Sequence, residues 1–576
     1  MTGVLNVLNI VFFEIALISV ALGMFQYAMR IKNKRDLRRK GIDASVLKQS
    51  FAESSDYDSR KYYTFLAIVA LIGVLIRVWQ FGSVPGGFNQ DGAMAAVDAK
   101  ALADYATDRF GTHLPVHLYA WGYGQMSSLL SYLMAIFIKP FGLSPITARL
   151  PQLLVSIAGG VFFYLFIRDL FGKTAGLVAA VFVAINPWHF LQSRWALDCN
   201  LLPHFFMGGL YFLNKGINGK SRFTFISMVF FSLCMYCYGI TIYTIPVFLL
   251  ATSIFYMARK KLTLRDTLIS AGIYLVFAWP FLLTMAVNYF EWDTITLPFA
   301  TIQYFSESVR SNDILVFSAE PLAQFKSNVW HLWSRAVLQM KDLNWNDVEG
   351  FGTMFLFSMP FFVIGFVELF RNKTQGNKGL VLIALLTGIW AGLLTNNVNI
   401  NRVNIIFYGM MMFVVLGIYF TIQEIKYLKW SNLCIYAVAG IFLLGTYFGP
   451  YADSIKTSFH YGFGESLAVA EESGAQQIYI TVDNVGNKSY KFSEILMLFY
   501  DKTDAAYFQG KINEDHGETL LPYSERYKYT SITPEVVLET QDLDVAYVIT
   551  NDAREYFDES RFNFDSFGNY CAVTKR

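Results

Sequence analysis

One acidic segment that directly follows the second long apolar run contains the residues best suited to chemistry. It reads VPGGFNQDGAMAAVDAKALADYATDRFG and covers residues 84–111. Its Pro and Gly residues end the preceding helix, and the Ala-rich stretch predicts a new helix that begins near Asp91. Asp98 follows seven residues later, which is about two helical turns, so we expect both carboxylates to lie on one face.

Two interpretations of this acidic face follow from the residues alone. A carboxylate at a helix N-terminus is stabilised by the helix dipole and by free backbone N–H groups, so Asp91 could be a cap and Asp98 a solvated residue. Alternatively, carboxylates on a loop held by a rigid scaffold could orient an acceptor molecule and remove its proton. The physics of the sequence leaves both interpretations open.

The composition indicates a protein that is surrounded by lipid. Of the 576 residues, 54% are hydrophobic and only 16% are charged, whereas soluble proteins contain about 25% charged residues. The net charge of +2 gives no electrostatic basis for binding nucleic acid, and no nucleic-acid partner is predicted.

Apolar runs long enough to cross a bilayer recur along the chain and predict an all-α polytopic membrane protein of about twelve transmembrane helices. They begin near positions 5, 62, 147, 174, 201, 222, 241, 264, 352, 379, 402 and 430. The shorter run from Gln125 to Phe141 is predicted to lie in the outer interface instead.

Basic loops predict how these spans are oriented. The stretch RIKNKRDLRRK, from Arg30 to Lys40, directly follows the first span, and the positive-inside rule places it in the cytoplasm. Both termini are then extracytoplasmic, and a plasma membrane is predicted because no organelle signal is present. Five further basic loops fall on the cytoplasmic side: those with Arg168 and Lys173, Lys215 to Arg222, Arg259 to Arg265, Arg371 to Lys378, and Lys426 to Lys429.

Three domains are predicted. Residues 1–61 form an anchor helix and a basic cytoplasmic loop, and residues 62–450 form a transmembrane body with outer loops 81–146 and 290–350. Residues 451–576 contain alternating runs at Gln477 to Val482 and Asp544 to Thr550, with a helical pattern at Phe492 to Tyr500. This pattern predicts a small extracytoplasmic α/β domain.

Several motifs occur in a characteristic order across residues 81–215. They are NQDGAMAAVDA with Asp91, HLPVHLYAWGYGQ, ARLPQLL with Arg149, and NPWHFLQSRWALDCN with Arg194 and Asp198. This order resembles the GT-C superfamily of membrane glycosyltransferases, especially the protein O-mannosyltransferase and lipid A aminoarabinose transferase types. The family often has an Asp-Glu pair where this chain has Asp91 and Gly92, so Asp91 is the sole strict match.

The resemblance implies an inverting transfer of a sugar from a polyprenyl-phosphate donor, with Asp91 as general base and Asp98 as its helper. Arg149, Arg194 and Arg402 are candidates for binding the donor phosphate. Each arginine could instead extend to the lipid headgroups or make a structural pair. For Asp198 we favour an ion pair with Arg194, four residues earlier, over a contact with the sugar.

Other outer segments have weaker signals. Arg402 lies in the polar turn NNVNINRVN, whose Asn side chains could bind sugar hydroxyls but more commonly satisfy the turn itself. Tyr238 in CMYCYGITIY is expected in the interfacial aromatic belt, with sugar stacking as the alternative. The loop with Glu291, Trp292 and Asp293 is expected to face the same cavity.

The sequence therefore predicts a glycosyltransferase, either hexosyl or pentosyl, with a polyprenyl-phosphate sugar as donor and membrane lipids around it. The acceptor is an extracytoplasmic glycan, lipid or protein. No cofactor and no metal site are predicted, because no ligand spacing of the zinc or calcium type is present. A lipid or sugar transporter or flippase and a non-catalytic envelope scaffold are the alternatives.

Overall fold

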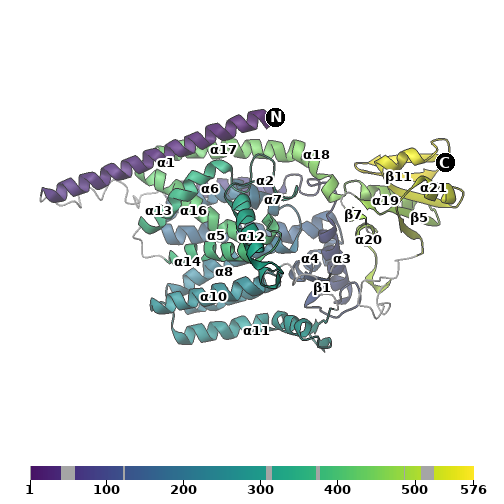
Figure 1. Cartoon of the computed structure of the whole chain (residues 1–576), viewed down its shortest axis with the longest axis horizontal. Coiled ribbons are helices and arrows are strands. Elements are labelled where there is room, and N and C mark those ends of the chain that lie inside the picture. Colours follow the sequence, from purple (N-terminus) through teal and green to yellow (C-terminus); the bar gives the residue numbers. More distant parts are fainter. Residues whose placement is uncertain are drawn as a thin grey trace.

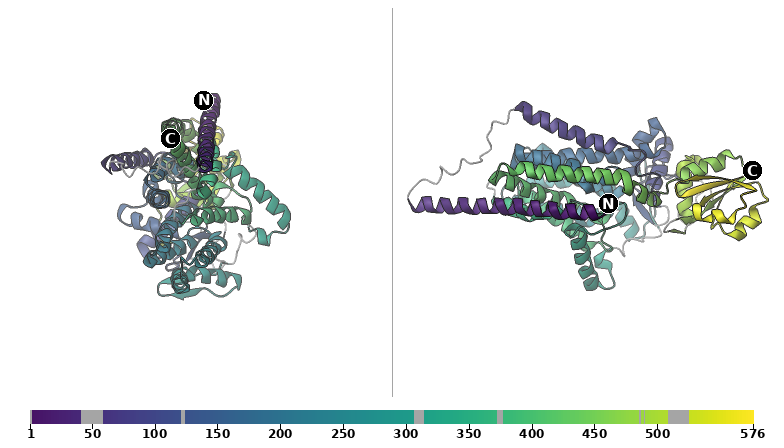
Figure 2. Two further views of the ribbon diagram at one scale, coloured as in Figure 1. Left: turned by 90° about the vertical axis from the view of Figure 1, so that its left-hand side faces the viewer. Right: turned by 90° about the horizontal axis from the view of Figure 1, so that it is seen from above.

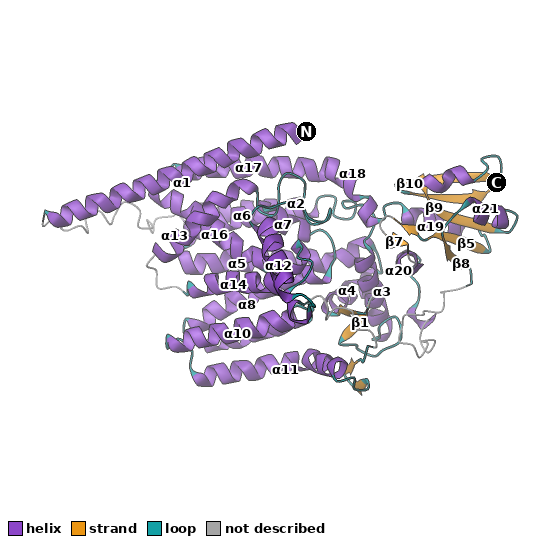
Figure 3. Ribbon diagram, in the orientation of Figure 1, coloured by secondary structure: helices purple, strands orange, loops and turns teal. Residues whose placement is uncertain are grey.

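A computed structural model describes residues 2–40, 59–120, 124–305, 314–371, 377–484, 487–488, 490–507 and 525–576. The chain forms a helical body whose long helices run roughly along one axis, and a smaller part with a β-sheet at one end of that axis (Figures 1 and 3). The helical class that the sequence predicts is confirmed.

Within the described residues, seven helices are long and apolar enough to cross a membrane. They are α1 (Thr2–Arg39), α2 (Ser59–Val78), α5 (Pro145–Phe171), α10 (Thr241–Ala258), α11 (Leu264–Tyr289), α16 (Ile406–Glu424) and α17 (Leu428–Thr446), which continues through a bend into α18 (Ala452–Ile455).

Shorter helices occupy the remaining apolar runs. They are α6 (Lys173–Ile185), α8 (Leu202–Ile217), α9 (Ser221–Met235), α13 (Met359–Arg371) and α14 (Gly379–Leu394). Every predicted span therefore coincides with a helix, while the number of crossings, twelve, stays a prediction. The run predicted to lie in the outer interface forms β2 (Gln125–Ser127) and α4 (Leu129–Phe141).

The helix α16 occupies the centre of the body. In an apolar stretch of 18 residues of α16, 89% of the residues are buried, compared with 17% in the corresponding stretch of α2 and 22% in that of α1. It packs against α13, α14, α6 and α1. Because α1 and α2 leave most of their apolar side chains exposed, these two helices form the periphery, where lipid can cover them.

The basic loops meet at one end of the body. Lys215 pairs with Asp169 at 2.5 Å, and the Asn377 side chain links Asn214 to Lys261. At the same end, three segments join in a second network: Glu424 accepts hydrogen bonds from Arg30 at 2.5 Å and from Arg371 at 2.6 Å. Loops that the sequence assigns to one side of the membrane are therefore neighbours in space.

The opposite end holds short helices and strands, which come from the segments that the sequence predicts to be outside. They are α3 (Gln90–Tyr105), β1 (His117–Tyr119), α7 (Pro187–Gln192), β3 (Ile295–Leu297), β4 (Ala300–Ile302), α12 (Pro321–Ala336) and α15 (Ile400–Val403). The helix α12 projects sideways from the body (Figure 2). The helix α3 is buried along almost its whole length between α4 and α20 (Tyr490–Tyr500).

The C-terminal part is built on a five-stranded mixed sheet in the order β10-β11-β9-β5-β8. Its strands are β5 (Gln477–Thr481), β8 (Tyr527–Thr530), β9 (Val545–Thr550), β10 (Phe562–Phe567) and β11 (Tyr570–Lys575). The strand β5 runs parallel to β8 and β9, whereas β11 is antiparallel to its neighbours. The helices α19 (Phe463–Glu472), α20 and α21 (Pro534–Thr540) and a short hairpin, β6 (Asp483–Asn484) with β7 (Asn487–Lys488), complete it. Both predicted strands and the predicted helix between them are present.

This C-terminal part contacts the acidic segment directly. Phe499 of α20 stacks on Phe88, with ring centroids 4.4 Å apart and planes at 4°. Gly87 has a φ of +77°, and a Cβ there would collide with the backbone of Phe459 and Tyr461. A side chain at residue 87 would therefore prevent both this backbone conformation and this close approach.

Candidate functional site

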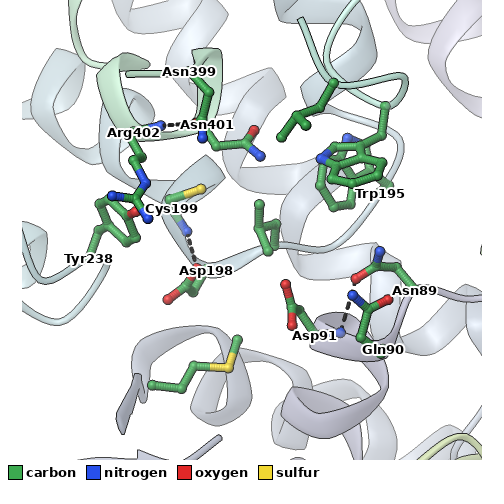
Figure 4. A pocket seen from close by; sticks show the side chains of 14 residues that line it. Asn89, Gln90, Asp91, Trp195, Asp198, Cys199, Tyr238, Asn399, Asn401 and Arg402 are labelled. Carbon is green, nitrogen blue, oxygen red and sulfur yellow. Dashed lines mark hydrogen bonds between the residues drawn. The ribbon is translucent and has the colours of Figure 1, made fainter. Parts of the chain in front are cut away.

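A polar cavity of about 190 Å³ lies at the end of the body opposite the basic loops and collects three of the predicted site residues, Asp91, Asp198 and Arg402. Their side chains point into the same space from three separate segments (Figure 4). The remaining lining residues are Asn89, Gln90, Met126, Trp195, Leu197, Cys199, Tyr238, Leu343, Trp345, Asn399 and Asn401.

Asp91 lies in the first turn of α3, where the sequence predicts the helix to begin. The side chain that caps this helix belongs to Asn89, whose Oδ1 accepts a hydrogen bond from the Asp91 backbone N–H at 2.9 Å. The interpretation of Asp91 as the cap is therefore wrong, because Asn89, two residues earlier, provides the cap. Because Asn89 provides the cap, the Asp91 carboxylate is directed into the cavity.

Asp98 lies outside the cavity. It is completely buried, its Oδ2 accepts a hydrogen bond from Nη1 of Arg109 at 2.6 Å, and its Oδ1 accepts one from the Arg109 backbone N–H at 3.0 Å. Seven residues advance a helix by about 10 Å along its axis, so a shared helix face does not bring Asp98 to the cavity. The structure gives Asp98 the role of a buried partner for Arg109, which corrects the predicted role of a helper.

Asp108 lies beside this ion pair and is also buried. Its Oδ1 accepts hydrogen bonds from the backbone N–H groups of Phe110 at 3.0 Å and Thr112 at 2.8 Å. Burial, together with the nearby charge of Asp98, raises the pKa of Asp108 to about 7. The loop after α3 is thus held by two buried carboxylates and one arginine.

Arg194 holds the end of α2 in place. Its Nε donates to the Tyr447 hydroxyl at 3.0 Å, and its two Nη groups donate to the backbone carbonyls of Ile76, Arg77, Trp79, Gln80 and Val84. The last carbonyls of a helix lack partners within that helix, and a guanidinium carries five N–H donors in one plane. The predicted ion pair between Arg194 and Asp198 is therefore wrong, because backbone carbonyls take up the guanidinium.

Arg149 holds the next part of the same connection. Its Nη2 donates to the Gly87 carbonyl at 2.6 Å, and its guanidinium carbon lies 5.1 Å from the centre of the Phe88 ring. Arg149 and Arg194 are both fully buried, so neither extends to lipid headgroups as the alternative interpretation expected. Together they fix the loop that leads from α2 to Asp91.

Arg402 reaches the cavity from a short helix, α15. Asn399 caps this helix by accepting a hydrogen bond from the Arg402 backbone N–H at 3.0 Å, and Nη1 of Arg402 donates to the Asn396 carbonyl at 2.8 Å. Its guanidinium lies beside Tyr238 (Figure 4). Of the three arginines predicted to bind the donor phosphate, Arg402 is the one that lines this cavity.

Asp198 begins a short 3₁₀ turn, Asp198–Leu201, and is buried except for 6% of its surface. Its Oδ1 accepts a hydrogen bond from the Cys199 backbone N–H at 2.7 Å. In Figure 4 the carboxylates of Asp198 and Asp91 approach the cavity from facing sides. Asp198 is therefore one of the residues that line the cavity.

A loop from the large outer segment completes the cavity. Oδ2 of Asp342 accepts hydrogen bonds from the Ile400 backbone N–H at 2.7 Å and from the Asn346 side chain at 2.9 Å. This connection brings Trp345 against the cavity beside α15. Burial raises the pKa of the neighbouring Asp347 to about 6.

Reasoning from the sequence missed Trp195 and Trp345 as lining residues. It also predicted that residues 291–293 face the cavity, whereas the part of the outer loop 290–350 that lines it is the stretch with Leu343 and Trp345. Trp292 is 48% exposed and stacks on Phe290, and the segment Glu291, Trp292 and Asp293 does not contribute to the cavity lining. The sequence signal that could have identified Trp345 is the segment NWND at residues 344–347, in which an aromatic residue lies among polar ones.

Comparisons with known proteins place this geometry in context. Residues 127–290 match the family described as dolichyl-phosphate-mannose-protein mannosyltransferase, and a search of curated proteins finds no match. ArnT from Cupriavidus metallidurans, solved with undecaprenyl phosphate, is similar with a TM-score of 0.53 at 10% identity, over 90% of this chain and 98% of that one. The archaeal oligosaccharyltransferase AglB from Archaeoglobus fulgidus, in complex with an inhibitory peptide and a dolichol-phosphate, has a TM-score of 0.46 at 14% identity, over 77% of this chain and 64% of that one.

The fold therefore defines the class: this is a multi-pass membrane protein with the fold seen in ArnT. Residues 127–290, from the end of β2 to the end of α11, match the protein mannosyltransferase family model, and the fold is similar to that of ArnT, so the resemblance that the sequence predicts is confirmed.

Proposed function

We propose that this protein transfers a sugar from a polyprenyl-phosphate donor to a hydroxyl group of an extracytoplasmic acceptor. The observation that carries the proposal is the cavity in which Asp91, Asp198 and Arg402 meet. The family match over residues 127–290 supports a glycosyltransferase. The undecaprenyl phosphate bound to ArnT, which shares the fold, supports a lipid-linked donor.

The proposed reaction is one inverting displacement at the anomeric carbon. The Asp91 carboxylate accepts the proton of the acceptor hydroxyl while its oxygen forms a bond to the anomeric carbon. The bond from that carbon to the phosphate oxygen breaks at the same time, and its electron pair leaves with the lipid phosphate. A positioned carboxylate base contributes about 10²–10⁴-fold to such a step.

Arg402 and Asp198 have complementary roles in this proposal. The negative charge on the phosphate grows as its bond to the sugar breaks, and a guanidinium stabilises it through charge-assisted hydrogen bonds. Asp198 accepts hydrogen bonds from sugar hydroxyls, which fixes the ring relative to Asp91. Asn399 and Asn401 line the same wall and offer further amide groups.

The size of the cavity supports transfer of a single sugar. Pockets for drug-sized ligands measure about 300–1,000 Å³, whereas this cavity measures about 190 Å³. Trp195 and Trp345 provide aromatic surfaces on which the apolar face of one sugar can pack. The transferred sugar is a hexose or pentose, the acceptor is a glycan, lipid or protein, and the reaction is proposed to need neither a metal ion nor a cofactor.

The test uses the purified full-length protein with a labelled polyprenyl-phosphate sugar and a membrane or cell-wall extract as acceptor. We expect Asp91→Asn to lower the transfer rate about 10²-fold or more, with the protein still folded. The matched control is Asp104→Asn on the same helix, where the carboxylate forms an exposed pair with Lys100. Full transfer by Asp91→Asn would refute the assigned base.

A second variant separates the base from the phosphate contact. Arg402→Gln is expected to lower the rate about 10²-fold and to weaken donor binding as well, whereas Asp91→Asn should leave donor binding nearly unchanged. Failure of the unaltered protein to transfer any of several lipid-linked sugars would count against the proposed function as a whole.

We also propose that the protein resides in the plasma membrane with the cavity and both termini outside. The basic loops, gathered at the opposite end, support this orientation through the positive-inside rule. A reporter fused after Arg576 should be accessible to an impermeant reagent in intact cells. A reporter that becomes accessible only after lysis would reverse the orientation.

A further inference from the structure

A second cavity, of about 300 Å³, lies in the other half of the body, between α2, α6, α16 and α17. Its walls are mainly apolar and include Phe65, Leu177, Val181, Ile418 and Ile422. Phe65 and Trp430 at its edge are 38% and 58% exposed, so the cavity faces the surface that lipid covers. We call it the lysine groove because of the two cations in its lining.

These cations, Lys61 and Lys429, line the groove from different helices. Lys61 lies in the first turn of α2 and Lys429 in the first turn of α17. Lys173, the first residue of α6, is adjacent, because its Nζ lies 5.6 Å from the ring of Tyr62, which also lines the groove. Three helix N-termini, each with a lysine, therefore meet at one mouth, and helix dipoles add to the positive potential there.

A buried polar group faces the same space. Asn432 lines the groove, is only 2% exposed, and its Oδ1 has no hydrogen-bond partner in the described part of the chain. Its Nδ2 donates to Oγ1 of Thr421 at 3.0 Å, and that hydroxyl donates to the Ile418 carbonyl at 2.8 Å. The amide orientation is therefore fixed, and a buried acceptor without a donor is costly.

We infer that the lysine groove binds an anionic glycerophospholipid whose headgroup carries hydroxyl groups, such as phosphatidylglycerol. The phosphate lies between Lys61 and Lys429, a headgroup hydroxyl donates to Oδ1 of Asn432, and an acyl chain follows the apolar walls. Basic pockets between transmembrane helices on the cytoplasmic side bind anionic headgroups by this combination of charge and apolar surface.

The groove is separate from the reaction cavity. Lys61 is in the first turn of α2, whereas Asp91 lies beyond the last turn of that helix. The groove also lies at the end where the basic loops gather. The inference therefore does not depend on the proposed transfer reaction, and the bound lipid has the role of a structural ligand that ties α2 to α6 and α17.

The experiment measures lipid binding by native mass spectrometry of the full-length protein in detergent. Phosphatidylglycerol and phosphatidylcholine with identical acyl chains are added separately, together with a polyprenyl phosphate as a third arm. We expect phosphatidylglycerol to bind about 10-fold more tightly than phosphatidylcholine. Equal binding of the two would overturn the inference, as would a polyprenyl phosphate that displaces phosphatidylglycerol from the groove.

Three variant proteins, one of them a control, identify the site. The double variant Lys61→Gln and Lys429→Gln should lose the 10-fold preference. The control is Lys220→Gln with Lys260→Gln, which removes the same charge from exposed loops at the same end, and it should keep the preference. A third variant, Val181→Trp, fills the groove and retains every charge, so it should weaken the binding of both lipids. A preference that survives in the double variant, or unchanged binding in Val181→Trp, would refute the site.

Discussion

The carboxylate of Asp98 and the guanidinium of Arg109 form a completely buried ion pair, with Oδ2 and Nη1 2.6 Å apart and exposures of 0% and 2%. The pair joins the middle of α3 to the loop that follows it. Arg109 also donates to the Tyr119 carbonyl at 3.1 Å, so a single guanidinium connects α3 with β1. The position of the helix that carries Asp91 thus depends on a charge pair outside the polar cavity.

This pair predicts a specific pattern of stability. Asp98→Asn leaves the Arg109 charge buried without its partner, and removal of one member of a buried pair costs about 3–5 kcal/mol of unfolding free energy. The double variant Asp98→Leu with Arg109→Met removes both charges and should recover most of that loss. Denaturant unfolding in detergent measures both values. A stable Asp98→Asn protein that has lost activity would instead return Asp98 to a catalytic role.

Arg194 predicts a second effect that acts through the backbone. Arg194→Lys keeps the charge but replaces a planar donor set that reaches five carbonyls and one hydroxyl. We expect a loss of about 2–4 kcal/mol in unfolding free energy, since several buried carbonyls lose a donor. Arg168→Lys is the control, because Arg168 forms a partly exposed pair with Asp169 and should change stability by less than about 1 kcal/mol. Equal effects of the two variants would contradict the assigned role.

The stack of Phe499 on Phe88 predicts that the C-terminal part stabilises the acidic segment. Phe499→Ala removes a buried ring and should cost about 3–5 kcal/mol. Hydrogen exchange should then rise in residues 86–95 of the outer loop. Phe557→Ala, in the separate core on the far side of the C-terminal sheet, should destabilise that core and leave exchange in residues 86–95 unchanged. Increased exchange in both variants would show general unfolding instead.

His460 predicts a dependence of stability on pH. It is buried against Phe492, its Nδ1 lies 3.1 Å from the Tyr570 hydroxyl, and burial lowers the pKa of His460 to about 3. An unfolded histidine has a pKa of about 6.5, so the unfolded chain binds more protons between these values. The contribution is therefore fully present above pH 6.5 and is lost as the pH falls towards 3, by about 1.4 kcal/mol for each pH unit.

The measurement compares thermal unfolding of the parent and of His460→Asn at pH 7 and pH 4.5. Asparagine tolerates the positive φ of 50° at this position better than most residues do. The parent should lose about 2–3 kcal/mol more than the variant between the two pH values. An identical loss in both proteins would assign the acid sensitivity to other groups.

Local patterns were sufficient for much of the fold. Each apolar run forms a helix because its backbone groups must be satisfied internally in lipid. The strand-like runs at residues 477–482 and 544–550 form β5 and β9, in which successive side chains point to opposite faces of the sheet. The Pro and Gly residues before Phe88 do not end α2 as the sequence predicted, because that helix already ends at Val78 and these residues lie in the connection to α3. The site was harder to predict from the sequence. The spacing of seven residues between Asp91 and Asp98 predicts a shared helix face but not the distance of each carboxylate from a cavity.

By itself, the sequence determined that this is a multi-pass membrane protein with an α/β region at its C-terminus, and that a helix begins near Asp91. Composition, apolar runs and local periodicity are properties of neighbouring residues, so they can be read without knowing which distant segments pack together. Only the tertiary structure decided that Arg402 lines the cavity, whereas Arg149 and Arg194 hold backbone carbonyls, and that Asp198 lines the cavity and Asp98 does not. A guanidinium or carboxylate binds whichever partner the packing of distant segments brings within hydrogen-bonding distance, and no local pattern contains that partner.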